Sequence, residues 1–364
     1  LAALAELTLA RLPMPVSHPV PAAVFQTLRP GVAPLAADPD LARAMTLANP
    51  AYEPGDLKEL QALYGRSLGE ADVRKVVEVM KYQDILVPNT GLLHGVDTLD
   101  AYDGGLLPTQ RFTAAKRQIL DLTGRIPGRD VSGSEAKEAG ILIRDAAARL
   151  PDAALLGNMN LKYVVADRLT DVWVDGAYHD LGLARTLQPG ERLTVPLATD
   201  RPLPDGITGL SLATYLEGAA ALPADTVVAT VTLTDAEGNR TSFPLRAGRE
   251  TAESTAPEQA GSARAVSDRR WAPGSKVYAA AFTLPRPAFP RSLTVEASVP
   301  VGASFTLAGV ALLDSRTKAD YSPSIDPDWA RVYTGDTKVY QNKRVQPRAF
   351  VPATVRLVES PDQQ

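Results

Sequence analysis

The chain has 364 residues, 45% apolar and 22% charged, so we expect a globular protein of two or three domains and not a disordered tail. The absence of cysteine excludes disulfides, thiolate metal sites and a cysteine nucleophile. The 42 acidic and 38 basic residues give a net charge of −4 without a long basic run, which argues against nucleic acid as a partner.

The first part of the chain mixes helical and strand patterns. Prolines punctuate residues 13–56 and allow only short helices there. The elements predicted after this segment are helices over residues 55–80, 113–123 and 135–150, and strands over residues 84–87 and 161–166. Because a helix followed closely by a dense apolar strand is typical of α/β layers, residues 1–178 are expected to form one α/β domain.

From about residue 184 the helical periodicity disappears and short strands recur between turn signals. In the predicted hairpin over residues 227–245, Val227, Ala229, Val231 and Leu233 form the apolar face of the first strand. The seven strands predicted in this region cover residues 193–197, 209–215, 226–234, 241–245, 277–283, 292–298 and 304–313. This pattern predicts an antiparallel, jelly-roll-like β-sandwich over residues 179–314.

The last segment, residues 315–364, carries two more strand candidates, over residues 337–341 and 349–357. We expect it to return to the first domain and complete it. The predicted fold class is therefore α+β: an α/β unit into which an antiparallel sandwich is inserted.

Motifs for several catalytic classes are missing from the sequence. It contains no G-x-S-x-G nucleophile turn, no phosphate-binding G-x-x-x-x-G-K-[ST] loop and no strand-bound G-x-G-x-x-G. The sequence has three histidines, too few to favour a metal site or acid–base catalysis based on imidazole groups. We therefore predict no cofactor, no metal and no catalytic residue in this chain.

One short segment nevertheless concentrates polar groups. It contains an imidazole, three carboxylates and a phenol: His94, Asp97, Asp100, Tyr102 and Asp103. Oxygen ligands suit a hard cation such as calcium or magnesium, but the regular oxygen pattern of an EF-hand is absent. A site for a polar ligand and a purely structural loop are the alternatives, and whether calcium is held stays open.

Sugar binding would require exposed aromatic rings, because a ring face stacks on a pyranose. Within the sandwich the candidates are Tyr215, Trp271 and Tyr278, with core packing as the alternative for each. The acidic stretch 314–328 reads as a solvated loop, and it could alternatively supply acids to a glycoside hydrolase.

Several ordered segments carry a family resemblance. They include Leu47-Ala-Asn-Pro-Ala-Tyr52, Pro88-Asn-Thr-Gly91, Leu99-Asp-Ala-Tyr-Asp103, the segment from Leu155 to Val165, and the segment from Val339 to Val351. In this order they resemble the YfhO-type family of bacterial multi-pass membrane proteins. Met159-Asn160-Leu161, Gln341 and Gln346 depart from the family pattern.

The resemblance implies a parent protein that is an integral-membrane glycosyltransferase dependent on lipid-linked sugars. This chain, which begins with Leu, would be its extracytoplasmic part at a bacterial cell membrane, joined to membrane helices that are missing here. The family's expected catalytic acid lies among those helices, so no position here inherits it. The leading hypothesis is that the chain binds or positions a glycan or a lipid-linked sugar acceptor. The rivals are a secreted polysaccharide hydrolase that uses an Asp pair and a purely structural or protein-interaction domain.

Overall fold

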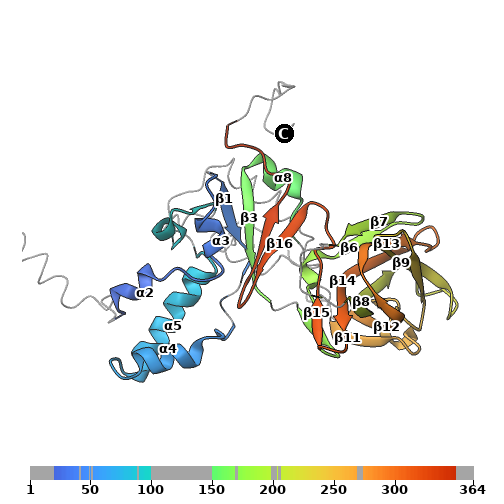
Figure 1. The fold of residues 1–364 in the computed structure, drawn as a ribbon, viewed down its shortest axis with the longest axis horizontal. Coiled ribbons are helices and arrows are strands. Elements are labelled where there is room, and N and C mark those ends of the chain that lie inside the picture. The colour runs from blue at the N-terminus through green and yellow to red at the C-terminus, as the bar shows by residue number, and fades with distance from the viewer. Residues whose placement is uncertain are drawn as a thin grey trace, which may run out of the picture.

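The computed structural model describes residues 20–40, 42–48, 50, 52–87, 90–99, 150–168, 171–197, 203, 206–268 and 274–349. In this part of the chain the protein is mostly β-sheet (Figure 1). A mixed sheet occupies the middle of the view, helices extend from it on one side, and antiparallel sheets consistent with a β-sandwich lie on the other.

The mixed sheet has the strand order β16-β17-β3-β1-β2. Its strands β1 (Arg43–Thr46), β2 (Asp97–Thr98) and β3 (Leu161–Ala166) are parallel, whereas β17 (Lys338–Asn342) and β16 (Trp329–Thr334) are antiparallel additions. β3 and β17 confirm the strands predicted over residues 161–166 and 337–341. Since β1–β3 precede the sandwich in the sequence and β16–β17 follow it, the chain leaves this sheet and later returns to it. The domain boundaries themselves stay a prediction.

Short helices flank the mixed sheet on the side away from the sandwich. They are α2 (Ala22–Gln26), α3 (Ala33–Ala36), α4 (Leu57–Tyr64), α5 (Glu70–Asp84) and the 3-10 turn η1 (Thr90–His94). α4 and α5 confirm the helical pattern, and their apolar stripes meet at Leu60, Val76 and Met80. No helix among the described residues is long and apolar enough to span a bilayer.

The strand predicted over residues 84–87 is wrong. α5 extends to Asp84, and Leu86 then turns the chain with a φ of 50°. Ile85 and Leu86 are buried against residues of the mixed sheet. The apolar run at these positions therefore reflects burial and not strand pairing. The helix predicted over residues 113–123 lies outside the described residues, as do the helix predicted over 135–150 and the strand predicted over 349–357 except for Leu150 and Ala349.

The sandwich region consists of two antiparallel sheets that share one apolar core. The first has the order β10 (Arg240–Arg246), β9 (Val227–Asp235), β13 (Pro290–Ala297) and β7 (Arg192–Pro196). The second has the order β11 (Arg264–Asp268), β12 (Lys276–Ala288), β8 (Ile207–Glu217), β14 (Ser304–Asp314) and β15 (Ala319–Tyr321), with β6 (Arg185–Leu187) also paired to β14. All seven predicted strands are present, whereas the short strands β6, β11 and β15 were not predicted.

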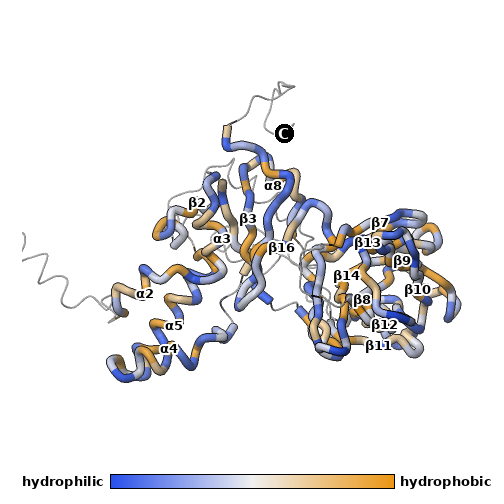
Figure 2. Tube along the Cα trace, viewed as in Figure 1, coloured by the Kyte–Doolittle hydropathy of each residue, from blue (hydrophilic) through white to orange (hydrophobic). Residues whose placement is uncertain are grey.

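The β9–β10 hairpin shows how side-chain alternation makes the core. Ala229, Val231 and Leu233 are buried, as predicted, but Val227 is 41% exposed and Val228 is buried in its place. A shift in register opposite Leu245 reverses the faces at the start of β9. The apolar residues are densest along the central strands β8 and β14 (Figure 2).

The elements between the mixed sheet and the sandwich are small. They are α8 (Ala153–Asn158), the hairpin β4 (Val172–Val174) and β5 (Ala177–His179), and the 3-10 turn η3 (Leu181–Leu183). The largest apolar cluster among the described residues extends from one unit into the other. It includes Met45 and Val164 of the mixed sheet together with Val231 and Val310 of the sandwich. The two units are therefore joined by a shared core, and this junction positions the polar groups described next.

Candidate functional site

The predicted polar segment is only partly described. His94 ends η1, and Asp97 begins β2 at the sheet edge, where its carboxylate pairs with Arg348 at 2.6 Å. Asp100, Tyr102 and Asp103 lie outside the described residues. Within the described ranges, no three His, Cys, Asp or Glu side chains are placed to hold a metal ion.

Two of the three predicted sandwich aromatics, Tyr215 and Tyr278, do not offer ring faces to a ligand. Tyr215 on β8 and Tyr278 on β12 are 4% and 0% exposed, and they pack in a small apolar cluster with Ala252. The Tyr278 hydroxyl donates to the Glu253 carbonyl at 3.1 Å. Both rings therefore fill the core, which was the alternative reading, and Trp271 lies outside the described residues.

An exposed ring that the sequence analysis missed is Trp173, on the β4–β5 hairpin. Its side chain is 62% exposed and lies 5.3 Å from the ring of Tyr178, centroid to centroid. The turn residues Asp175 and Gly176 both have positive φ, of 53° and 82°. An Asp-Gly pair between aromatic residues is a hairpin signal that could have located this element from the sequence.

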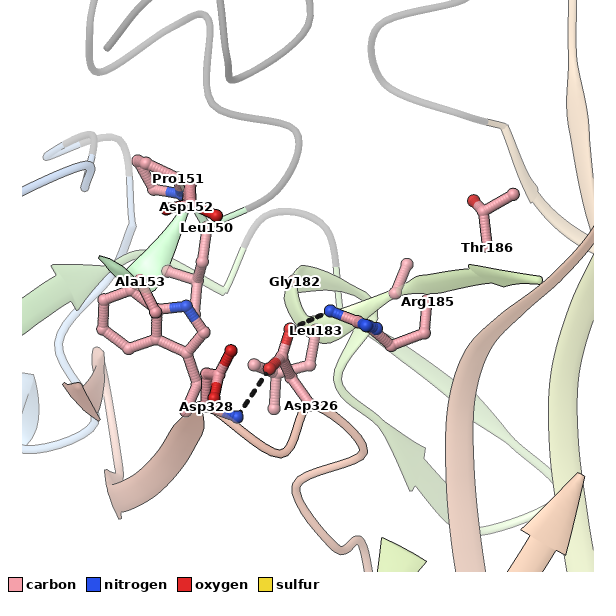
Figure 3. A pocket seen from close by; sticks show the side chains of 12 residues that line it. Leu150, Pro151, Asp152, Ala153, Gly182, Leu183, Arg185, Thr186, Asp326 and Asp328 are labelled. Atoms are coloured by element: carbon pink, nitrogen blue, oxygen red, sulfur yellow. Dashed lines mark hydrogen bonds and ion pairs between the residues drawn. The ribbon is translucent and has the colours of Figure 1, made fainter. Parts of the chain in front are cut away.

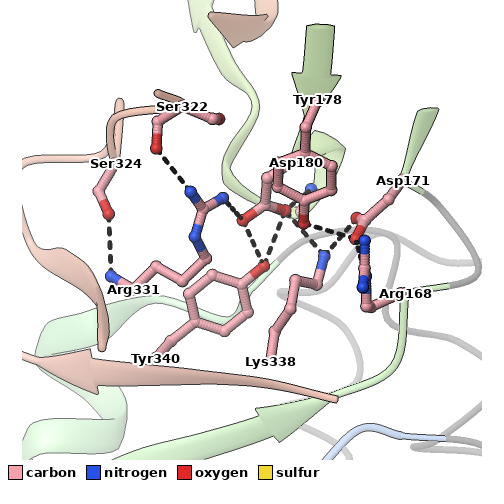
Figure 4. A network of polar contacts seen from close by, with 10 residues as sticks. Arg168, Asp171, Tyr178, Asp180, Ser322, Ser324, Arg331, Lys338 and Tyr340 are labelled. Atoms are coloured by element: carbon pink, nitrogen blue, oxygen red, sulfur yellow. Dashed lines mark hydrogen bonds and ion pairs between the residues drawn. The ribbon is translucent and has the colours of Figure 1, made fainter. Parts of the chain in front are cut away.

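A buried ionic network connects the hairpin to the mixed sheet (Figure 4). The Lys338 ammonium on β17 lies 2.5 Å from Asp171 and 2.8 Å from Asp180, which precedes η3. The Tyr340 hydroxyl donates to Asp180 at 2.8 Å, and Arg331 on β16 pairs with the Asp180 carboxylate at 2.9 Å. Lys338 and Tyr340 can both reach Asp180 because alternate residues of a strand share a face.

Three cations, Lys338, Arg331 and Arg168, face the two carboxylates of this network, and these charges oppose the effect of burial on the pKa values. Burial alone would raise the pKa of Asp180, but Lys338 and Arg331 hold that pKa well below its ordinary value. Burial alone would lower the pKa of Lys338, and Asp180 with Asp171 raises it instead. Burial raises the pKa of Tyr340. Since the polar groups pair with one another, the network serves to hold the junction together and leaves little for a ligand to bind.

Beside this network a cavity of about 280 Å³ opens between the mixed sheet and the sandwich (Figure 3). We call it the junction pocket. Its walls come from the start of α8, from the η3–β6 segment and from the turn that leads into β16. The polar and aromatic side chains that line it are Asp152, Arg185, Thr186, Asp326, Asp328 and Trp329.

The carboxylates of the junction pocket have different partners. Asp326 pairs with Arg185 at 3.2 Å and accepts the Asp328 backbone N–H at 2.9 Å. Asp152 caps α8 by accepting the Leu155 N–H at 2.7 Å. Among the described residues the Asp328 carboxylate makes no hydrogen bond or ion pair, so it is available to accept hydrogen bonds from a ligand.

Sequence reasoning found only part of this pocket. Asp326 and Asp328 belong to the acidic stretch 314–328, but Asp314 of the same stretch is buried and pairs with Arg316 at 2.7 Å. Asp152 and Arg185 were missed because they lie far apart in the sequence and only the tertiary fold brings them together.

Comparison with known proteins adds little. No family model matches the chain, and no curated protein is significantly similar to it. Among solved structures, one described as "Family 16 Carbohydrate Binding Module-2" is 12% identical over 41% of this chain and 96% of its own, with a TM-score of 0.21. At that TM-score, neither the fold nor the function of this chain follows from the match.

Proposed function

We propose that this chain binds a glycan in the junction pocket. The observation that carries the proposal is the pocket's chemistry: an unpaired carboxylate, an ion-paired guanidinium and a hydroxyl lie around one cavity of about 280 Å³. Sugar hydroxyls both donate and accept, so they match such a mixed lining. The cavity is slightly smaller than the roughly 300–1,000 Å³ of pockets that hold drug-sized ligands, which suits a single sugar ring.

The wider setting that we propose follows the family resemblance. The chain would be the extracytoplasmic part of a YfhO-type membrane glycosyltransferase, attached through helices outside this sequence, and its ligand would be a glycan or a lipid-linked sugar acceptor. Two of the resembling segments, the one from Leu155 to Val165 and the one that begins at Val339, contact each other. Asn342 Nδ2 donates to the Leu161 carbonyl at 3.0 Å, and Asn160 Nδ2 donates to the Gln346 carbonyl at 2.9 Å. Contact between segments so distant in sequence supports treating them as parts of one α/β unit, into which we propose that a jelly-roll-like sandwich is inserted.

Glycan binding is tested by titrating methyl glycosides and cell-envelope glycan fragments against the protein, with calorimetry and tryptophan fluorescence as readouts. Asp328→Asn removes a hydrogen-bond-accepting charge at nearly constant size, and we expect it to weaken binding about tenfold, as for a hydrogen bond to a charged group. Glu237→Gln, an equivalent change in the exposed β9–β10 turn, should leave affinity unchanged. Absence of saturable binding across the panel, or equal affinity of Asp328→Asn and the parent protein, would contradict the proposal.

The same pocket argues for binding over hydrolysis. A glycosidase needs two carboxyl groups that act on opposite sides of one bond. Here Asp326 is held by Arg185 and Asp152 caps a helix, so only Asp328 remains uncommitted. Turnover of chromogenic glycosides that is lost in Asp328→Asn would favour the hydrolase instead.

A further inference from the structure

The junction pocket carries more negative charge than a site for a neutral sugar requires. Three carboxylates and one guanidinium line it, which gives a net charge of −2; they belong to Asp152, Asp326, Asp328 and Arg185. Lys343 donates to the Pro327 carbonyl at 3.2 Å, between two of these acids in the sequence, but its side chain is not part of the lining. The pocket therefore repels an anionic ligand and attracts a cationic one.

The guanidinium in the pocket pairs with only one of the three carboxylates. Arg185 lies 3.2 Å from Asp326, which also accepts the Asp328 backbone N–H (Figure 3). One oxygen of Asp152 caps α8, and its other oxygen makes no hydrogen bond among the described residues. The Asp328 carboxylate has no charged partner in the part of the chain that the structure describes. A carboxylate of this kind in the wall of a cavity can accept charge-assisted hydrogen bonds from a ligand cation.

The spacing of the carboxylates suits a ligand larger than a metal ion. Within the described ranges, no three acidic side chains lie close enough together to hold a bare ion. The acids instead surround a cavity of about 280 Å³. A protonated amine placed against Asp328 would donate hydrogen bonds to that one carboxylate and feel the other charges through space.

A second observation indicates that the ligand also carries hydroxyl groups. Trp329, the first residue of β16, lines the same pocket and is 2% exposed, and among the described residues its indole N–H has no acceptor. The indole N–H of a buried tryptophan usually has a hydrogen-bond partner. A sugar hydroxyl can accept this hydrogen bond, whereas an ammonium group cannot. The lining therefore suits a molecule that has both a positive group and hydroxyls.

We propose that the ligand of the junction pocket is an amino sugar with a free, protonated amine, such as a glucosamine unit without its acetyl group. The amine donates to Asp328, and a ring hydroxyl accepts from Trp329. Acetylation removes the charge, and a uronic acid reverses it, so both should bind less tightly. This inference rests on the proposed function and goes beyond it by assigning the class of sugar.

Calorimetric titration of matched methyl glycosides tests the assignment. The probes are the methyl glycosides of glucosamine, galactosamine and mannosamine, each compared with its hydroxyl counterpart, together with those of N-acetylglucosamine and glucuronic acid. Measurement at about pH 6, below the pKa of about 7.7–8.0 typical of an α-amino group, keeps the probe amines protonated. We expect at least one amino sugar to bind roughly tenfold more tightly than its hydroxyl and acetylated counterparts, as for a hydrogen bond between charged groups.

Two variants locate the preference. Asp328→Asn should reduce the ratio of amine to hydroxyl affinity to about one, because the charge that the amine recognises is gone. The Asp328 carboxylate has no partner among the described residues, so the substitution breaks no internal contact there. Glu237→Gln removes the same charge in the exposed β9–β10 turn and should leave the ratio unchanged, which separates a local effect from one of net charge.

The possible results separate this inference from the proposed function. If sugars bind but amino sugars bind no more tightly than their hydroxyl counterparts, the inference is wrong and glycan binding stands. A preference for amines that persists in Asp328→Asn, or ethanolamine that binds as tightly as the amino sugars, also overturns the inference, because the amine is then recognised elsewhere or without the sugar ring. If none of the sugars binds, both proposals are wrong.

Discussion

Individual buried charges at the junction should contribute far more to stability than the exposed ion pairs of the sandwich. In Lys338→Met, Asp171 and Asp180 would lose their shared cation inside the protein, and we expect the free energy of unfolding to fall by about 3–5 kcal/mol. Urea denaturation measures this change. Arg192→Met breaks the exposed Arg192–Glu296 pair and should change stability by less than about 1 kcal/mol. Similar losses for the two variants would show that the network is not a stabilising element.

A second residue-scale prediction concerns pH. His179 on β5 is fully buried with its Nε2 3.0 Å from Ser211 Oγ, and burial lowers its pKa from 6.5 to about 4. The unfolded chain therefore takes up this proton at higher pH than the folded protein does, and stability falls as pH decreases. Between pH 7 and pH 5 we expect a loss of about 2 kcal/mol in unfolding free energy.

Chemical denaturation at a series of pH values checks this prediction. His179→Asn, which cannot titrate in this range, should show a shallower slope between pH 7 and pH 5, whatever its absolute stability. An unchanged slope would mean that other groups cause the acid sensitivity.

At the scale of elements, α8 fits closely against the chain that follows β17. Gly157 lies inside α8, and a Cβ there would collide with the Arg344 carbonyl. The Gly157 carbonyl also accepts the Gln346 N–H at 3.0 Å. Glycine at this position therefore lets a helix and a returning segment approach each other, and it does so at the expense of helix propensity.

Gly157→Ala should consequently destabilise the protein by about 1–3 kcal/mol, although the same change in an exposed helix stabilises by about 1 kcal/mol. Thermal unfolding followed by circular dichroism measures the sign. Gly69→Ala, before α5, is the control, because a Cβ there meets nothing within 4 Å, and it should change stability by less than about 1 kcal/mol. A stabilised Gly157→Ala variant would show that α8 can move away from the returning chain.

At the scale of the whole molecule, the shared core predicts one cooperative unfolding transition. Leu161 on β3 and Leu293 on β13 are both fully buried in the same apolar cluster. Leu161→Ala and Leu293→Ala should each cost about 2–5 kcal/mol and shift a single calorimetric peak as a unit. Two peaks, of which each variant shifts only one, would show that the mixed sheet and the sandwich unfold independently.

Local patterns were sufficient for the longer elements. The alternation in β9 and the apolar run in β3 reflect burial of one or both strand faces, and such patterns are readable from neighbouring residues alone. The same pattern gave a wrong strand at Ile85 and Leu86, because buried residues after a helix show the same apolar run as a buried strand. It also missed β6, β11 and β15, since strands of three to five residues at a sheet edge carry too little periodicity to be recognised.

The sequence by itself determined that this protein is rich in antiparallel strands, has no cysteine chemistry and lacks the common catalytic motifs. Only the tertiary structure decided which polar residues meet. Arg185 and Asp326 at the junction pocket, and Arg331 and Asp180 in the buried ionic network, come from segments separated by many residues. The physical reason is that secondary structure depends on neighbours in sequence, whereas a binding site depends on how packed layers bring distant segments together.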